Sequence, residues 1–238
     1  MSLLALAVAG VVALAAAIQV LGGIGFALIS SPLLIMSLGH TNGIRLTLVM
    51  AIMVNTVVLL RHHRHVRYAD TGRLLVPALV FVAPALLVSS HLGGPAVSVV
   101  SGVAILGASA VLGSGRQVGW VDGPAGAVTA GAASGVLNVL AAISGPPVAL
   151  FASHRGWGPV VTTATLQAYA LPLNLVTLAA LGLPSGHGSY LGWAAVGLVV
   201  GTGVGLPLTL RVNRSALRWV TLVVAAGGGL VLIIRGLT

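Results

Sequence analysis

The chain has 238 residues, of which 58% are hydrophobic and 5% are charged, and its mean hydropathy is +1.12. A soluble domain of this length cannot bury so much apolar surface, so the composition excludes one and predicts an integral membrane protein. Eleven Arg residues and two acidic residues give a net charge of +9, but the Arg residues lie between apolar runs without interleaved aromatic residues. This pattern excludes a nucleic-acid-binding surface and indicates the loop charges of a multi-pass protein.

Several classes of site are missing from the sequence. It has no Cys, which excludes disulfides and thiolate metal sites. No spacing typical of metal ligands, phosphate loops or dinucleotide-binding loops occurs. We therefore expect no metal, no cofactor, no catalytic residue and no enzymatic activity. We also expect no cleavable signal peptide, because no basic residue precedes Leu3 and the first Arg is Arg45.

Apolar runs near 20 residues, the length of a membrane-spanning helix, follow one another along the chain. The first run is far longer than that and is interrupted by Gly22-Gly23-Ile24-Gly25 and by Ser30-Ser31-Pro32, which are helix-breaking signals. The predicted elements of the first half are 3–21, 25–39, 44–60, 74–91 and 96–113. Those of the second half are 124–141, 144–153, 160–181, 190–209 and 216–234.

The ten elements predict an all-α polytopic membrane protein with five elements in each half. Residues 1–115 form a first transmembrane repeat, and residues 116–238 form a second one. The two repeats belong to one integral membrane domain. Ser30-Ser31-Pro32 falls opposite Ser144-Gly145-Pro146 at a shift of roughly 114 to 120 residues, which favours an internal duplication.

The Arg residues orient the two halves. The loop after the third element carries Arg61, Arg64, Arg67 and Arg73, whereas its counterpart in the second half carries none, and for the next loop the pattern reverses. Five crossings per half put both Arg-rich loops on one side, and nine of the eleven Arg residues are then cytoplasmic under the positive-inside rule. We therefore predict an inverted repeat with both termini outside. A re-entrant hairpin at the start of each half gives the same parity, so the first helices are broken or re-entrant.

The two breaks are the candidate binding site. Helices beginning at Pro32 and Pro146 would point unpaired N–H groups and positive dipole ends at the membrane centre, where broken helices of transporters bind ligands. Nearby hydroxyls would cap those ends, and two converging N-termini form an anion site. The candidate substrate-binding residues are Gly22, Gly23, Gly25, Ser30, Ser31, Pro32, Asn138, Ser144, Gly145, Pro146 and Gln167.

Other polar residues lie at membrane depth. Gln19, Asn55 and Asn174 are expected to be interhelical hydrogen-bond partners. The glycines Gly131/Gly135 and Gly197/Gly201/Gly205 are spaced by four residues and indicate close helix packing.

The predicted spans contain no carboxylate, which argues against a carboxylate proton relay or sodium site. Proton coupling through His40, His91 or His154, which lie near span ends, stays an alternative.

The residues around both breaks resemble the TauE/SafE family of sulfite exporter-like membrane transporters. The resemblance rests on Gly22-Gly23-Ile24-Gly25-Phe26 running into Pro32-Leu33-Leu34, on Arg45, and on Gly135 leading to Pro146 and the Thr-rich segment 162–165. It implies a carrier of sulfur-containing or related organic anions. The lack of Cys argues against the thiosulfate-uptake type.

We therefore predict a multi-pass cell-membrane transporter of a small anion, sulfite or an organosulfonate, that works by alternating access. Its partners would be the anion and the lipid bilayer, with no nucleic acid. Export is favoured, because an inside-negative potential drives anions outward. The alternatives are a passive anion channel and a non-transporting membrane scaffold protein. The sequence leaves the oligomeric state open.

Overall fold

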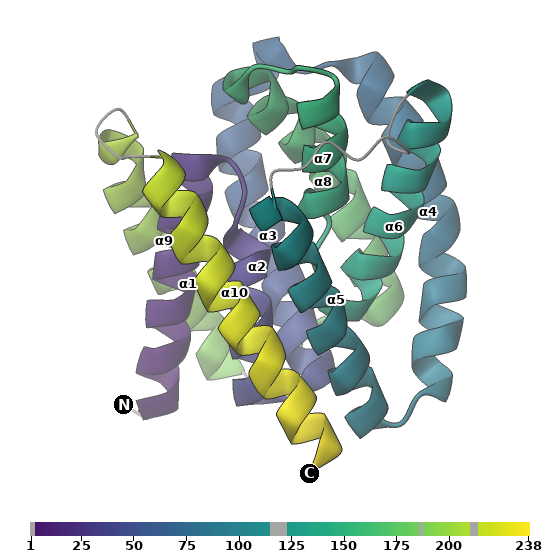
Figure 1. Cartoon of the computed structure of the whole chain (residues 1–238). Helices are drawn as coiled ribbons and strands as arrows, with labels where there is room; N and C mark the ends of the chain where they lie inside the picture. Colours follow the sequence, from purple (N-terminus) through teal and green to yellow (C-terminus); the bar gives the residue numbers. More distant parts are fainter. Residues whose placement is uncertain (1–2, 115–122, 186–187, 210–213) are drawn as a thin grey trace.

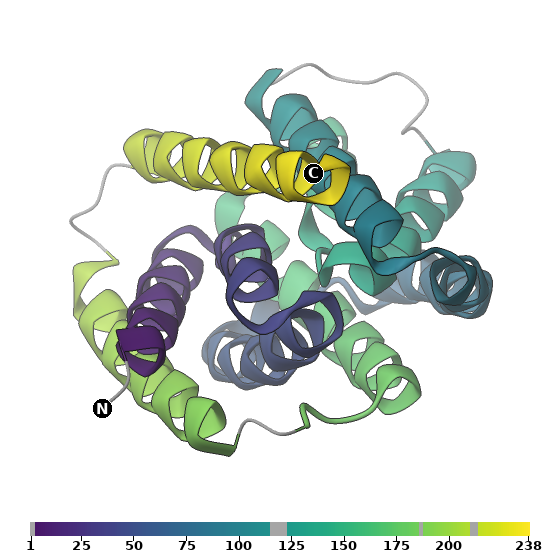
Figure 2. The same cartoon turned by 90° about the horizontal axis from the view of Figure 1, so that it is seen from below.

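The computed structural model describes residues 3–114, 123–185, 188–209 and 214–238. In this part of the chain all regular secondary structure is helical, and the helices form one bundle (Figures 1 and 2). Among the described residues, eight helices are long and apolar enough to cross a membrane, which confirms the all-α, multi-pass prediction. The elements are α1 (Leu3–Gly22), α2 (Phe26–Leu38), α3 (His40–His62), the short 3₁₀ turn η1 (His63–His65), α4 (Tyr68–His91), α5 (Gly94–Ser114), α6 (Gly123–Ala141), α7 (Gly145–His154), α8 (Pro159–Leu181), α9 (Gly188–Leu208) and α10 (Arg214–Leu237).

Two helices, α2 and α7, are too short to span a bilayer. They have 13 and 10 residues, which gives lengths of about 20 and 15 Å against a hydrocarbon core of about 30 Å. In Figure 1, α2 runs downward and α7 runs upward from the middle of the bundle. Each half therefore starts with a long helix followed by a half-length helix that returns towards the side from which the chain came.

Two predicted helix starts are wrong. Helix α2 begins at Phe26 and not at Pro32, which lies inside the helix. A membrane helix tolerates an internal proline because neighbouring groups satisfy the freed backbone carbonyl. Helix α4 begins at Tyr68, which places Asp70 in its first turn, where a carboxylate is favoured by the helix dipole. Asp70 is buried and paired with Arg67 at 2.7 Å and with Arg73 at 3.4 Å, so one acidic residue does lie in a span, at its end.

A single shift relates the helices of the two halves. Helix α3 starts at His40 and ends at His62, and α8 starts at Pro159 and ends at Leu181, both 119 positions later. The same shift takes Phe26, the start of α2, to Gly145, the start of α7. It also takes α1 to α6 and α4 to α9. Accordingly, α1 packs on α9 and α6 packs on α4, while α3 packs on α8 and α5 packs on α10. This is the packing expected for two copies related by a two-fold axis.

Glycine faces bring these helices close together. A Cβ added at Gly201 would lie 2.0 Å from the carbonyl oxygen of Ala13 on α1, and one added at Gly135 would lie 2.3 Å from that of Ala78 on α4. Gly131, Gly197 and Gly205 make similar close approaches. The close-packing role predicted for both glycine stripes is thus confirmed, at the α1–α9 and α4–α6 interfaces.

The connections sort by end. The α3–α4 connection, the end of α9 and the start of α10 lie at the upper end in Figure 1, and both chain ends lie at the lower end. Helix α1 rises from the lower end, and α6 descends from the upper end. These directions are the ones that an inverted repeat requires, and the inverted repeat stays our interpretation of them. Arg116, Arg211 and the predicted boundary at residue 115 lie outside the described residues.

Candidate functional site

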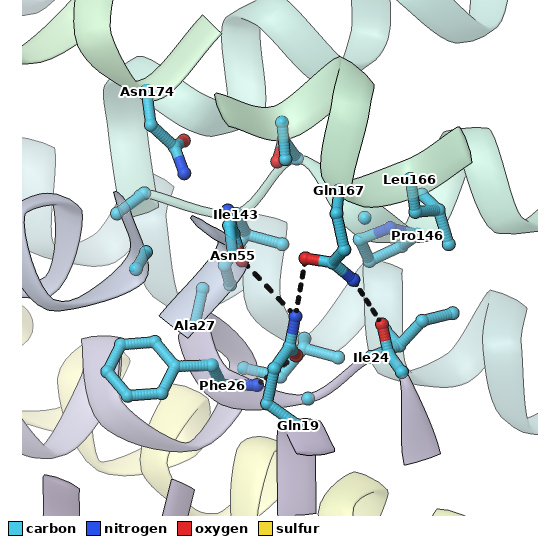
Figure 3. A pocket seen from close by; sticks show the side chains of 18 residues that line it. Gln19, Ile24, Phe26, Ala27, Asn55, Ile143, Pro146, Leu166, Gln167 and Asn174 are labelled. Atoms are coloured by element: carbon cyan, nitrogen blue, oxygen red, sulfur yellow. Dashed lines mark hydrogen bonds between the residues drawn. The ribbon is translucent and has the colours of Figure 1, made fainter. Parts of the chain in front are cut away.

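The two breaks meet at a cavity of about 50 Å³ inside the bundle (Figure 3). Segment 23–28 forms one wall, and segment 142–146 forms another, so the start of α2 faces the start of α7. Residues of α1, α3 and α8 complete the lining. The polar side chains among its lining residues are those of Gln19, Asn55, Ser144, Gln167 and Asn174.

A side-chain amide network joins the first break to both halves of the chain. The Nε2 of Gln19 donates to Asn55 Oδ1 at 3.3 Å and to Gln167 Oε1 at 3.1 Å, as Figure 3 shows. The Oε1 of Gln19 accepts from the backbone N–H of Phe26 at 3.1 Å, and thus takes one free donor of α2. Gln167 Nε2 donates to the carbonyl of Gly23 at 2.9 Å. These bonds satisfy buried amides that would be costly to leave unpaired in a membrane.

The second half contains a matching amide pair. Asn138 Nδ2 donates to Asn174 Oδ1 at 2.8 Å, and these two residues are 36 positions apart, as are Gln19 and Asn55. The shift of 119 that relates α3 to α8 takes Gln19 to Asn138 and Asn55 to Asn174. In each half, the long helix before the break carries an amide that donates to an Asn: α1 to α3 in the first half, and α6 to α8 in the second half. Gln167 has no such counterpart, because the equivalent position in α3 is Leu48.

The two helix N-termini offer different donors to the cavity. Ala27 and Leu28 in the first turn of α2 line it, and their N–H groups make no backbone hydrogen bond among the described residues. In α7 only Gly145 offers a lining N–H, since Pro146 lacks one. The hydroxyl of Ser144, the residue before α7, makes no cap hydrogen bond. Both helices aim a positive dipole end at this cavity.

The backbone at the breaks explains their glycines. Gly23 has φ +77°, and a Cβ there would lie 2.1 Å from Thr163 Oγ1, so the position needs both the left-handed conformation and the missing side chain. Ala142, its equivalent 119 positions later, has φ 55°, which is rare for a residue other than glycine. Such strained positions gather at functional sites.

Six of the eleven predicted site residues line the cavity: Gly23, Gly25, Ser144, Gly145, Pro146 and Gln167. Five do not. Gly22 lines a neighbouring cavity, and Asn138 is absent from the lining but donates a hydrogen bond to the lining residue Asn174. Ser30, Ser31 and Pro32 are buried within α2, where Ser30 donates to the carbonyl of Phe26 and caps nothing.

Gln19, Asn55 and Asn174 line the cavity but were not among the predicted site residues, because a role in joining helices was preferred for each over contact with a ligand. Their repeated spacing of 36 residues, with amides at both positions, was the available signal. The predicted pairing of Ser30-Ser31-Pro32 with Ser144-Gly145-Pro146 differs from the shift of 119 between the helix bounds, which aligns residues 23–25 with residues 142–144.

No charged side chain is among the lining residues of the cavity, and none of His40, His91 and His154 lies there. The described residues also contain no group of three or more His, Cys, Asp or Glu suited to hold a metal ion. The chemistry available is therefore that of backbone N–H groups, amides and one hydroxyl. Such a set offers hydrogen-bond donors and acceptors to a small polar ligand.

Comparison with known families gives one match. The model of the family described as sulfite exporter TauE/SafE matches residues 8–232, which is nearly the whole chain. Comparisons with curated proteins and with solved structures gave no match.

Proposed function

The chain belongs to the sulfite exporter TauE/SafE family, and on this premise we propose that it exports sulfite or a related small sulfur-containing anion across the cell membrane. The observation that carries the proposal is the meeting of two half-length helices, N-terminus to N-terminus, at a polar cavity without charged side chains. Helix N-termini bind anions through unpaired N–H groups and the helix dipole. The anion would be held by the backbone of segment 25–28, by Ser144 and Gly145, and by the amides of Asn55, Gln167 and Asn174, while Gln19, whose two N–H groups are already used, would hold this network in place.

We further propose that transport works by alternating access between the two halves. Two larger cavities, of about 360 and 210 Å³, lie at the upper, Arg-rich end. They share Gly23, Ile24 and Leu28 with the central cavity, whereas a cavity of about 550 Å³ at the lower end shares no lining residue with it. This difference supports a state in which the central cavity is open towards the cytoplasm. The release step would open the opposite end.

Two Arg residues make hydrogen bonds between the two halves of the chain at the lower end. Arg45 on α3 donates to the carbonyl of Leu181 at the end of α8, and Arg235 on α10 donates to the carbonyl of Met36 on α2 at 3.1 Å. Cations are favoured at helix C-termini, where carbonyls are unpaired. Both hydrogen bonds join the first half to the second, so opening of this end would break them.

The test is anion binding by two matched serine variants. Ser144→Ala removes a hydroxyl that lines the cavity, and we expect sulfite affinity to fall about 10-fold to 100-fold, as for a lost hydrogen bond to a charged group. Ser31→Ala is the control, because its hydroxyl is fully buried, has no hydrogen-bond partner and lies outside the cavity. Binding is measured by calorimetry on the purified full chain. If both variants bind sulfite as tightly as the parent, the helix breaks do not form the anion-binding site.

A flux assay completes the test. Sulfite export from proteoliposomes should saturate with concentration and fall in the Ser144→Ala variant. Flux that rises linearly with concentration would indicate a passive channel.

A further inference from the structure

The charge of the central cavity limits the charge of its ligand. Its lining residues include no Arg or His, so the positive potential comes from the N-termini of α2 and α7. Each helix end is equivalent to about half an elementary charge, and two ends therefore balance about one negative charge. A second charge on the ligand would be buried without a partner, which is strongly unfavourable in a membrane interior.

The Ser144 hydroxyl is independent evidence that this space takes a polar ligand. The residue is 6% exposed and lines the cavity, and among the described residues its hydroxyl has no intramolecular hydrogen bond. A hydroxyl can both donate to an oxyanion and accept from a protonated oxygen. The amide oxygens of Asn55 and Gln167 already accept from Gln19 and each keep a second lone pair. The lining thus offers acceptors as well as donors, which suits a ligand that carries one proton.

The size of the cavity limits the ligand further. A volume of about 50 Å³ corresponds to roughly four water-sized groups, at 10–15 Å³ for each. Sulfite and hydrogen sulfite have four heavy atoms, whereas an aminoalkyl sulfonate such as 2-aminoethanesulfonate has seven. A ligand confined to the central cavity is therefore the size of sulfite, whereas an organosulfonate would extend into the adjoining larger cavities.

We propose that the central cavity is selective for monovalent oxyanions of about four heavy atoms, and that it takes sulfite as hydrogen sulfite. This inference rests on the proposed function and names the substrate class of the same site. Each transported hydrogen sulfite carries one negative charge and one proton out together, so the ligand supplies the proton and no protein carboxylate is needed.

The experiment compares sulfite with chlorate, a pyramidal four-atom oxyanion that stays monovalent at every pH used. Calorimetric Kd values are measured on the purified full chain at pH 6 and pH 8. Sulfite takes up its proton near neutral pH, so the Kd for total sulfite should rise about tenfold over this range, as the bound form becomes a minor species. The Kd for chlorate should stay constant. Sulfate, a divalent anion, should bind about 100-fold or more weakly than chlorate.

The outcomes separate this inference from the proposed function. A sulfite Kd that is constant or falls with pH would overturn the monovalent selectivity, as would sulfate binding as tight as that of chlorate or a lack of chlorate binding. If Ser144→Ala still weakens sulfite binding in those cases, the proposed function stands. If Ser144→Ala and the parent bind sulfite equally, the proposed site itself fails.

Discussion

Gly23→Ala is the substitution whose effect the structure predicts most directly. Its Cβ would lie 2.1 Å from Thr163 Oγ1 and 2.9 Å from both Cβ and Cγ2 of Thr163, so no rotation of that side chain removes all the contacts. Left-handed backbone costs an alanine about 1–2 kcal/mol, and overpacking costs about 1–3 kcal/mol. The sum is about 2–5 kcal/mol of stability. Ala142, at the equivalent position, adopts the same left-handed backbone region. We therefore expect the contact with Thr163 to cause the larger part of the stability loss.

The displacement should also reach the ligand. The carbonyl of Gly23 holds Gln167, and Gly23 lines the cavity, so a shift here moves the start of α2 relative to α8. We expect sulfite affinity to fall about tenfold or more, because donors that point at a charged ligand lose their geometry. Thermal unfolding of the purified protein should move down by roughly 5 °C or more, at about 2–4 °C for each kcal/mol in a chain of this size.

Two variants control this prediction. Gly22→Ala places a Cβ 3.0 Å from Leu217 Cδ2, the far end of a flexible side chain, and should leave stability within about 1 kcal/mol of the parent. Adding Thr163→Ala to Gly23→Ala removes the 2.1 Å contact and should restore part of the loss. If Gly23→Ala unfolds at the same temperature and binds sulfite as tightly as Gly22→Ala, the reasoning from the break geometry is refuted.

The other predictions concern packing, topology and energy coupling. Gly201→Ala, whose Cβ would lie 2.0 Å from the Ala13 carbonyl oxygen, should lower the unfolding temperature, whereas Gly203→Ala on the same helix, with nothing within 4 Å, should keep or raise it; equal temperatures would contradict the close α1–α9 packing. In this Cys-free chain, single cysteines at Arg64 and Arg214 should react with an impermeant thiol reagent from the cytoplasmic face only, and labelling from opposite faces would exclude the inverted repeat. Sulfite export in proteoliposomes should follow an imposed membrane potential at about 2.3 kcal/mol per charge per 100 mV and persist without a sodium gradient; loss of flux on removing sodium would contradict this coupling.

Much of the fold could be predicted from the sequence, because apolar length and helix breakers act locally. The run predicted at 160–181 is α8, Pro159–Leu181, with Pro159 in the first turn. The half-length element predicted at 144–153 is α7, Gly145–His154. The sequence also indicated the break at Gly22-Gly23-Ile24-Gly25, since glycine-rich segments end membrane helices. Each of these predictions needs only the neighbouring residues and the thickness of the bilayer.

The register of the two halves and the composition of the cavity depended on the tertiary structure. Ser30-Ser31-Pro32 resembles Ser144-Gly145-Pro146 in sequence, but Pro32 lies inside α2, and Gly228 of α10 packs against it. Similarly, Gln19 and Asn55 are distant in the chain and meet only because α1 and α3 pass beside the first break.

The physical reason lies in two different costs. The free energy gained by removing apolar side chains from water depends on each segment separately. Composition and spacing alone therefore establish which segments form membrane helices. A buried amide must instead find a particular partner on another helix, and which partner it finds depends on how the helices pack. The sequence by itself therefore determined a multi-pass helical membrane protein with two helix breaks, and the tertiary structure decided which polar groups face the shared cavity.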